Sequence, residues 1–129
     1  MPQKFLVEII SPEKTVLKSE ASEVIIPSFE GEIGILKDHI NLITFLRPGL
    51  IKIVNGEEKI FFVENGTVEF SNNNLLILTS TTILLSEINK NFLEKLISES
   101  EEKLNENNST DKEKYLLTHK IQTLKNISL

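Results

Sequence analysis

One short stretch of the chain, SFEGEIGILKDH at residues 28–39, gathers the residue types from which binding sites and catalytic sites are built. Two glycines lie three positions apart, at Gly31 and Gly34. Three carboxylates and an imidazole accompany them: Glu30, Glu32, Asp38 and His39. In principle such a set could bind a phosphate group, hold a metal ion or transfer protons. The spacing of the residues decides among these chemistries.

A phosphate-binding loop does not fit this stretch. Such a loop aims backbone N–H groups at an anion from the N-terminus of a helix, generally with a lysine and a serine or threonine directly after the glycines. Here Glu32 lies between the glycines, and the surrounding pattern is that of strands. Because a carboxylate at this position would repel a phosphate, we do not expect a nucleotide or phosphate ligand here.

The residues needed for metal binding or for catalysis are also missing from this stretch. The chain has two histidines, His39 and His119, in different halves, and it has no cysteine, so a cluster of ligands at metal spacing is not formed. Asp38 beside His39 could transfer protons, but the nearby hydroxyls of Ser28 and Thr44 lack the turn that activates a nucleophile. The sequence therefore predicts no catalytic residue, no metal and no cofactor, and we do not expect the chain to be an enzyme by itself.

What remains for the two glycines is a role in the backbone. Glycine permits sharp turns and close approach between chain segments. A loop that is tightly specified and yet carries no chemistry is typically shaped for a partner. We therefore interpret residues 28–34 as a contact loop in which Glu32 faces a neighbouring molecule.

Composition limits the class of partner. The formal net charge is -5 and the pI is about 5.1, which disfavours a nucleic-acid partner because such a surface needs a dense set of lysines and arginines. The N-terminal apolar run is short and is broken by Glu8, so we expect no signal peptide. No stretch reaches the roughly 20 apolar residues of a spanning helix. We expect a cytosolic protein without direct membrane insertion.

The first two thirds of the chain carry the pattern of an all-β domain. Short apolar runs rich in β-branched residues predict eight strands, at residues 5–10, 23–27, 42–46, 50–54, 59–64, 67–70, 75–79 and 82–86. Glycine, proline and asparagine stand between them and supply the backbone angles of tight reversals. Two runs, 59–64 and 75–79, are apolar on both faces, which indicates strands covered on each side or covered by a partner. We expect a β-sandwich of about eight to ten strands over residues 1–86.

After residue 86 the apolar period changes from two to about 3.6. One apolar stripe predicts a first helix: Ile88, Phe92, Leu93, Leu96, Ile97 and Leu104. A polar turn follows, and Thr110 with Glu113 has the spacing of a capping box at the start of a second helix. The second stripe contains Leu117, Ile121 and Leu124. Residues 87–129 are thus predicted to form an antiparallel two-helix hairpin.

The second helix is basic where the first is acidic. Residues 114–129 contain Lys114, Lys120 and Lys125 and no acid. These lysines either form a solvated face that suits the C-terminal end of a helix or meet an acidic surface elsewhere. Both interpretations remain open from the sequence.

The quoted motifs together resemble a known family. The runs EGEIGILKDH, RPGLIKIV and ENGTVEFSNNNLLILTSTTI are similar to the epsilon subunit of bacterial F-type ATP synthases, whose mitochondrial equivalent is called delta. The resemblance spans nearly the whole chain. The positions that match the main motifs are Glu30, Gly31, Glu32, Ile33, Gly34, Ile35, His39, Arg47, Pro48, Gly49 and Leu50.

This resemblance implies a non-catalytic rotor subunit of the central stalk of a proton-translocating ATP synthase. In the family the sandwich binds the gamma subunit and rests on the c ring, at the cytoplasmic face of the bacterial plasma membrane. The hairpin either folds against the sandwich or extends toward the catalytic alpha and beta subunits, where it restrains ATP hydrolysis. The implied interface residues are Glu30, Gly31, Glu32, Ile33, Gly34, His39, Arg47, Pro48 and Gly49. The lysines at 114, 120 and 125 are the implied contacts of an inhibitory helix.

The chain also departs from the family pattern. Lys37-Asp38 replaces a common Pro-Gly, and Ile40-Asn41 replaces a common Ala-Pro. Members of the family that bind ATP carry an aspartate and an arginine at the start of the first helix, where this chain has Asn89 and Phe92. We therefore predict no regulatory ATP binding. The alternative to the rotor subunit is a stand-alone β-sandwich adaptor that recruits an unrelated protein.

Overall fold

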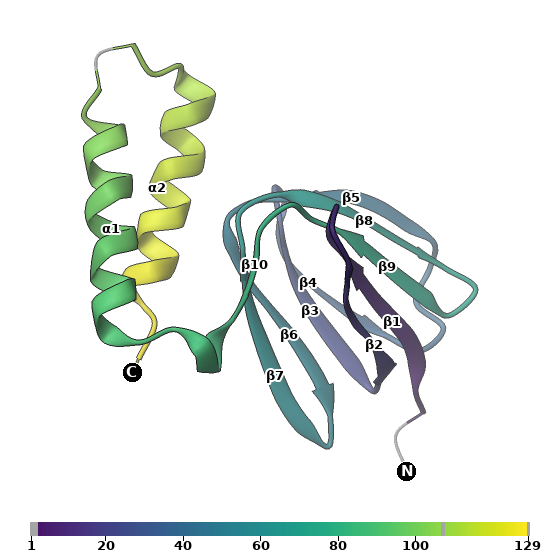
Figure 1. The fold of residues 1–129 in the computed structure, drawn as a ribbon. Coiled ribbons are helices and arrows are strands. Elements are labelled where there is room, and N and C mark those ends of the chain that lie inside the picture. The colour runs from purple at the N-terminus through teal and green to yellow at the C-terminus, as the bar shows by residue number, and fades with distance from the viewer. Residues whose placement is uncertain (1–2, 107, 129) are drawn as a thin grey trace.

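The computed structural model describes residues 3–106 and 108–128, which form a β-sandwich followed by two helices (Figure 1). The strands are β1 (Phe5–Ile10), β2 (Thr15–Ala21), β3 (Glu23–Ser28), β4 (Gly31–Leu36), β5 (Leu42–Leu46), β6 (Gly49–Asn55), β7 (Glu57–Val63), β8 (Gly66–Ser71), β9 (Asn74–Leu78) and β10 (Thr82–Leu84). A 3-10 turn, η1 (Leu85–Glu87), leads into α1 (Lys90–Leu104) and α2 (Asp111–Lys125). The predicted fold class is confirmed.

The strands form two layers that are joined at one corner. One layer has the order β4-β3-β6-β7-β10, and the other has the order β5-β8-β9-β1-β2. A single pair, Ser28 with Leu46, connects β3 to β5 and makes the strands one continuous sheet. All neighbours are antiparallel except β1 and β9, which are parallel. This topology closes most of the sandwich into a barrel-like wrap around one core.

The core between the layers follows from alternation along the strands. Val68 and Phe70 point inward from β8, while Thr67 and Glu69 face out. Phe70 packs edge to face against Phe5, with ring centroids 5.5 Å apart. The full cluster of buried residues draws on both layers, and each fully buried large side chain contributes about 1.5–3 kcal/mol of transfer free energy.

The strand β7 is apolar on both faces because two different partners cover it. Phe61 points into the sandwich core, whereas Phe62 points out and packs in a second cluster with Ile88, Leu93 and Leu124. The prediction for residues 59–64 is therefore confirmed. For residues 75–79 the described residues provide no such cover, and the side chain of Leu78 is 44% exposed.

Both helices begin at an asparagine or threonine that caps them. The side chain of Asn89 accepts a hydrogen bond from the backbone N–H of Phe92 at 2.8 Å, and that of Thr110 accepts one from Glu113 at 3.1 Å. The predicted cap at Thr110 is thus confirmed. One residue of the predicted first stripe is misplaced, since Phe92 lies at the edge of the stripe and is 37% exposed.

Two sequence interpretations were wrong. Residues 15–21 form β2, which we missed because Lys18 and Glu20 interrupt the apolar run; both are exposed on this edge strand. Residues 28–34 are not a loop: the chain reverses within Phe29 and Glu30, and β4 begins at Gly31. The two glycines of β4 led us to interpret this stretch as a turn. Its apolar residues do not alternate cleanly, so the pattern of a strand was not recognised.

Candidate partner interface

The β3–β4 turn is built by Ser28, which is fully buried. Its hydroxyl donates a hydrogen bond to the carbonyl of Gly31 at 2.7 Å and accepts one from the backbone N–H of Glu30 at 3.1 Å. Gly31 has a φ of 116°, a value that side chains rarely adopt. Phe29 and Glu30 are therefore held out at the tip of a rigid turn, and both are exposed.

The remaining predicted residues of this stretch lie on β4. Glu32 and Gly34 are exposed, while Ile33 is half-buried and packs against the core. Gly34 of β4 pairs with Ile25 of β3. A Cβ at position 34 would meet only the carboxylate of Glu23, at 3.8 Å. Gly34 is thus not needed for a turn, in contrast to Gly31.

The segment from Arg47 to Gly49 lies against the start of the same hairpin. The backbone N–H of Arg47 donates to the carbonyl of Pro27 at 3.1 Å. Pro48 and Gly49 are buried, and a Cβ on Gly49 would lie 2.5 Å from the Cβ of Pro27. The tertiary structure therefore brings the predicted residues of 30–34 and 47–49 together at one end of the sandwich, as a shared surface.

Helix α2 lies against this end and closes a crevice of about 330 Å³. Its walls are Pro27, Glu32, Arg47, Pro48, Gly49, Leu50 and Lys52 from the sandwich and His119, Gln122, Thr123 and Asn126 from the helix end. Burial and, secondarily, the positive charge of Arg47 lower the pKa of His119 below its ordinary value of 6.5. The crevice thus joins the predicted contact surface to the hairpin.

His39 lies apart from that surface, at the other end of β4. Its Nδ1 is 2.8 Å from the carbonyl oxygen of Ile40, and its ring packs edge to face on Phe70. Asp38 next to it has a φ of 68° and exchanges two hydrogen bonds with the side chain of Asn73. A glycine would adopt this φ without strain, and the two hydrogen bonds hold Asp38 in it.

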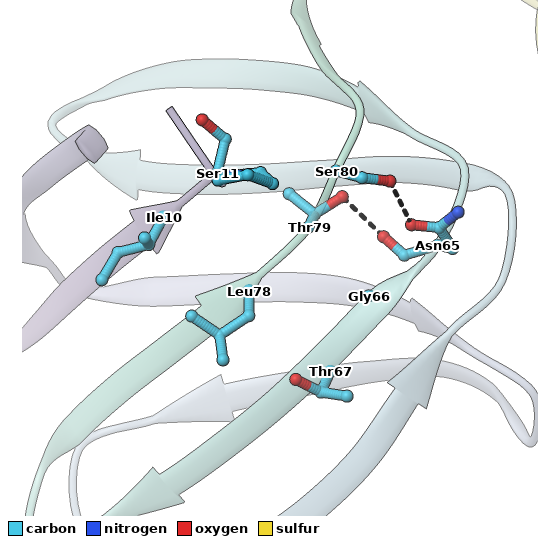
Figure 2. Close-up of a pocket in the computed structure, with 9 residues that line it drawn as sticks. Ile10, Ser11, Asn65, Gly66, Thr67, Leu78, Thr79 and Ser80 are labelled. Carbon is cyan, nitrogen blue, oxygen red and sulfur yellow. Dashed lines mark hydrogen bonds between the residues drawn. The ribbon is translucent and has the colours of Figure 1, made fainter. Parts of the chain in front are cut away.

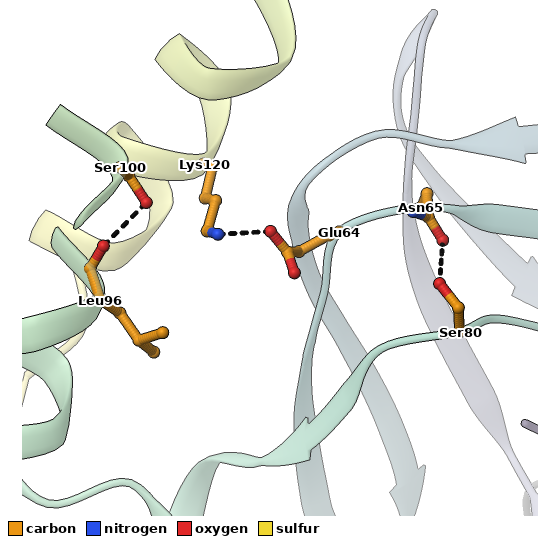
Figure 3. Close-up of polar contacts among 6 residues, drawn as sticks. All are labelled: Glu64, Asn65, Ser80, Leu96, Ser100 and Lys120. Carbon is orange, nitrogen blue, oxygen red and sulfur yellow. Dashed lines mark hydrogen bonds and ion pairs between the residues drawn. The ribbon is translucent and has the colours of Figure 1, made fainter. Parts of the chain in front are cut away.

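Two of the three predicted lysines are paired within the chain. Lys120 forms an ion pair with Glu64, at the end of β7 (Figure 3). Lys125 lies 3.5 Å from Glu101 of α1. Lys114 is exposed. Lys120 is thus available to an acidic partner only after α2 leaves the sandwich.

Exposed apolar side chains lie on the outside of the second layer, and the sequence pointed only to the part of them at residues 75–79. Ile43 and Phe45 on β5 are 77% and 61% exposed. The strand register places further apolar residues of β9 and β1 on the same side, beyond the polar Thr67 and Glu69 of β8: Phe45 pairs with Thr67, Thr67 with Leu78, and Leu78 with Ile10. We call this surface the outer apolar face and define it by Leu6, Ile10, Ile43, Phe45, Leu76 and Leu78. The apolar residues on both faces of residues 42–46 were the signal that could have revealed it.

A shallow cavity of about 370 Å³ lies at one end of the outer apolar face (Figure 2). Its polar side chains serve the fold: Thr79 donates to the carbonyl of Asn65 at 2.6 Å, and Ser80 donates to the Asn65 side chain at 2.9 Å. None of the residues that line it is ionisable. The cavity is therefore a shallow hollow at the edge of the outer apolar face, and its lining residues offer no acid, base or metal ligand for catalysis.

The described residues include no cluster of three or more histidine, cysteine, aspartate or glutamate side chains that could hold a metal ion. Over the same residues, no helix has both the length and the apolar character needed to cross a bilayer.

Comparison with known proteins identifies relatives of the whole chain. A family model described as the β-sandwich domain of the ATP synthase delta/epsilon chain matches residues 4–84. An ATP synthase epsilon chain of Pelagibacter ubique (strain HTCC1062) is 46% identical over 99% of this chain and 100% of its own length. An ATP synthase epsilon chain of Leptospira interrogans (serovar Lai, strain 56601) is 38% identical over 76% of this chain and 78% of its own.

Solved structures share the fold. A chain of the Euglena gracilis mitochondrial ATP synthase, solved as OSCP/F1/c-ring, superposes with a TM-score of 0.81 at 18% identity, over 97% of this chain and 81% of its own. A chain of the central stalk and c-ring of the Tetrahymena thermophila mitochondrial ATP synthase gives a TM-score of 0.70 at 19% identity, over 95% of both chains. At these identities the likeness concerns the arrangement of sandwich and hairpin.

Proposed function

The chain belongs to the ATP synthase delta/epsilon family, and from this membership we propose that it is a non-catalytic rotor subunit in the central stalk of a proton-translocating ATP synthase. In this role residues 1–86 hold the gamma subunit to the c ring, so that rotation of the ring is transmitted during ATP synthesis. Residues 87–129 form a regulatory hairpin. The complex places the subunit at the cytoplasmic face of the bacterial plasma membrane.

The outer apolar face is the observation that carries this proposal. Exposed large apolar side chains gathered on one side of a sheet, such as Ile43 and Phe45 here, typically mark a protein-protein interface, and a subunit held permanently in a stalk needs such a surface. We assign the gamma subunit to it, because an obligate partner favours an apolar contact. These contact residues are additional to the interface residues that the sequence predicted.

We assign the c ring to the end of the sandwich that carries the β3–β4 turn. This end presents Glu30 and Glu32 on a rigid hairpin and the segment from Arg47 to Gly49 beside it. Charged and polar side chains on fixed backbone suit a contact with polar loops, which specify orientation through complementary charge. The predicted interface residues at this end are Glu30, Gly31, Glu32, Ile33, Gly34, Arg47, Pro48 and Gly49. In this assignment the exposed Glu30 and Glu32 make the contacts, and the buried Pro48 and Gly49 support the turn from behind.

The subunit works without an active site of its own. The crevice beside α2 contains one imidazole, and the cavity beside the outer apolar face contains no ionisable group. Neither set provides a nucleophile with a base in hydrogen-bond reach. Asn89 caps α1 with a neutral amide, where members of the family that bind ATP carry an aspartate.

The decisive experiment is a binding assay with the gamma subunit of the same organism. We expect the full chain to form a stable complex at micromolar concentration and the double variant I43E/F45E to lose it, since two carboxylates would be buried without partners. The control is Lys59→Glu at an exposed position of β7, which changes the net charge by the same amount. No complex with the natural chain would sink the rotor role, whereas equal binding by the double variant would sink only the choice of face.

A second assay addresses the hairpin. We propose that Lys114, Lys120 and Lys125 engage an acidic surface of the alpha or beta subunits when the hairpin extends, and so restrain ATP hydrolysis. Truncation after Ser86 then raises the ATPase activity of the assembled enzyme, and charge removal at the three lysines reproduces part of the rise. Unchanged hydrolysis after truncation would refute this regulation and leave the rotor role intact.

The stand-alone adaptor is not favoured, because the relatives that match nearly the whole chain are ATP synthase subunits.

A further inference from the structure

The hairpin is attached to the sandwich by an apolar cluster and by a polar contact that are separate in space. The apolar cluster centres on Phe62 of β7 and on Leu93 and Leu124 of the helices. The polar contact lies farther along α2, where four side chains meet that come from three parts of the chain: Phe29 from the β3–β4 turn, Arg47 from the segment after β5, and Tyr115 and His119 from α2. We call these four residues the aromatic latch.

The geometry of the latch is specific. The rings of Phe29 and Tyr115 stack with centroids 5.9 Å apart and an interplanar angle of 15°. The ring of Tyr115 meets that of His119 at 4.4 Å and 65°. Nη1 of Arg47 donates a hydrogen bond to the Tyr115 hydroxyl at 3.4 Å. Tyr115 thus contacts the sandwich twice, through its ring at Phe29 and through its hydroxyl at Arg47, and its ring also contacts His119 of the same helix.

The charges around His119 come from every element packed against α2. Arg47 and Lys52 on the sandwich share its crevice, and so does one acid, Glu32. The next charges outward are an ion pair of Lys120 with Glu64 and, toward α1, a pair of Lys125 with Glu101. Glu30 on the turn and Lys112 and Lys114 on α2 are exposed to solvent. The acids Glu64 and Glu101 are already paired with lysines, so a proton on His119 adds a third cation to a crevice that holds two cations, Arg47 and Lys52, and one carboxylate, Glu32.

From this geometry we propose that the aromatic latch makes docking of the helical hairpin sensitive to pH: protonation of His119 weakens the docked state and shifts the hairpin toward release. The proposal concerns the chain itself and does not depend on the rotor role.

The contact between Tyr115 and His119 does not oppose this effect. An imidazolium gains cation–π attraction from a tyrosine ring, but both residues lie on α2, four positions apart, so this contact exists in the docked and the released hairpin alike. What docking adds is burial and the proximity of Arg47. Both lower the pKa of His119, and both are lost on release.

The direction with pH follows from linkage. The docked hairpin binds fewer protons at His119 than the released one, so docking is strongest above the ordinary pKa of 6.5. As pH falls through 6.5, the released state takes up a proton first and the docked state becomes less favourable. Below the lowered pKa of the docked state, both states are protonated and the docking equilibrium no longer changes with pH. Each unit by which docking lowers this pKa corresponds to about a tenfold change in the docking equilibrium.

The test measures the separation of hairpin and sandwich by fluorescence transfer. The natural chain has no cysteine, so Lys37→Cys and Lys112→Cys, both at exposed positions, provide the two dye sites. The labelled chain also carries Glu64→Gln. Because this change removes the ion pair to Lys120, it should make the docked and released populations more nearly equal, so that a shift between them is easier to measure. The released fraction is measured between pH 7.5 and pH 5.5, a window in which ordinary carboxylates remain ionised.

We expect the released-to-docked ratio to rise severalfold as pH falls in the labelled background. His119→Gln, which keeps a polar side chain that cannot take up a proton, should make the ratio independent of pH. His39→Gln removes the other histidine, which lies outside the latch, and should leave the response unchanged. A ratio that does not change with pH, or a response that survives His119→Gln, would overturn the proposal; circular dichroism at each pH verifies that the sandwich stays folded.

Discussion

The sandwich and the hairpin differ in what each needs to bury its apolar residues. The sandwich closes its own core: buried side chains from both layers contact one another, with Phe70 and Ile77 among the least exposed. The helices have few fully buried side chains, and those that cluster with Phe62 depend on β7 for cover. We therefore expect the sandwich to remain folded if the hairpin is released, and we do not expect the hairpin to stay folded by itself, since a two-helix hairpin lacks a core of its own.

The largest expected effect comes from emptying the sandwich core. Phe70→Ala removes a ring that packs against Phe5 and is 1% exposed, and we expect a loss of about 3–5 kcal/mol in the free energy of unfolding. Denaturant titration by circular dichroism gives this value. Phe45→Ala on the outer apolar face is the matched control and should change it by less than about 0.5 kcal/mol. Equal losses would mean that the two faces do not differ as described.

The matching change in the hairpin should separate the two regions. Leu124 is fully buried between α2 and the sandwich, so Leu124→Ala should weaken docking by about 2–5 kcal/mol. The sandwich transition should stay nearly in place. Hydrogen exchange of α1 and α2, compared with that of β8, distinguishes release from unfolding. Simultaneous loss of protection in β8 would show that the hairpin is part of one cooperative unit.

A third change tests the end of the sandwich where both regions meet. Gly49→Ala places a methyl group against Pro27, at 2.5 Å before relaxation, and should cost about 1–3 kcal/mol by forcing β3 and β6 apart. Gly34→Ala is the control, because a Cβ there meets only a flexible carboxylate. Thermal unfolding of both variants gives the difference. A cost at Gly34 equal to that at Gly49 would contradict the close approach.

The smallest effect concerns the start of α2. Thr110→Ala removes the side-chain oxygen that accepts from the backbone of Glu113, for which we expect about 1 kcal/mol of lost helix stability. Thr118→Ala, whose hydroxyl bonds only to the carbonyl of Lys114 in the same helix, should cost less. Hydrogen exchange in the first turn of α2 reports the difference. A larger effect at Thr118 would argue against a capped start.

The sequence predicted elements well where apolar period and turn residues agreed. The strand at residues 42–46 and the cap at Thr110 lie where they were expected. It failed where the local signal was mixed: β2 carries Lys18 and Glu20 among its apolar residues, and β4 contains two glycines. The sequence also does not show which glycine has a positive φ. We interpreted both Gly31 and Gly34 as turn residues, which is correct for Gly31 and wrong for Gly34.

The site shows the same division. The sequence singled out residues 30–34 and 47–49, but it could not show that Pro27 joins them into one surface, nor that His39 lies at the opposite end of β4. The outer apolar face required the strand register, because Phe45, Thr67 and Leu78 are far apart in the chain. Two predicted lysines, Lys120 and Lys125, turned out to be paired within the chain, which pattern alone does not reveal.

The sequence by itself determined the two periods, the cap at Thr110, the absence of cysteine chemistry and the resemblance to a rotor subunit, because each of these depends on residues close together in the chain or on composition. Only the tertiary structure decided which apolar faces are covered and which charges meet. Burial and pairing depend on contacts between distant segments, such as Phe29 with Tyr115 and Glu64 with Lys120. The physical reason is that register and docking are set by the whole fold, while period and capping are set within a few turns of chain.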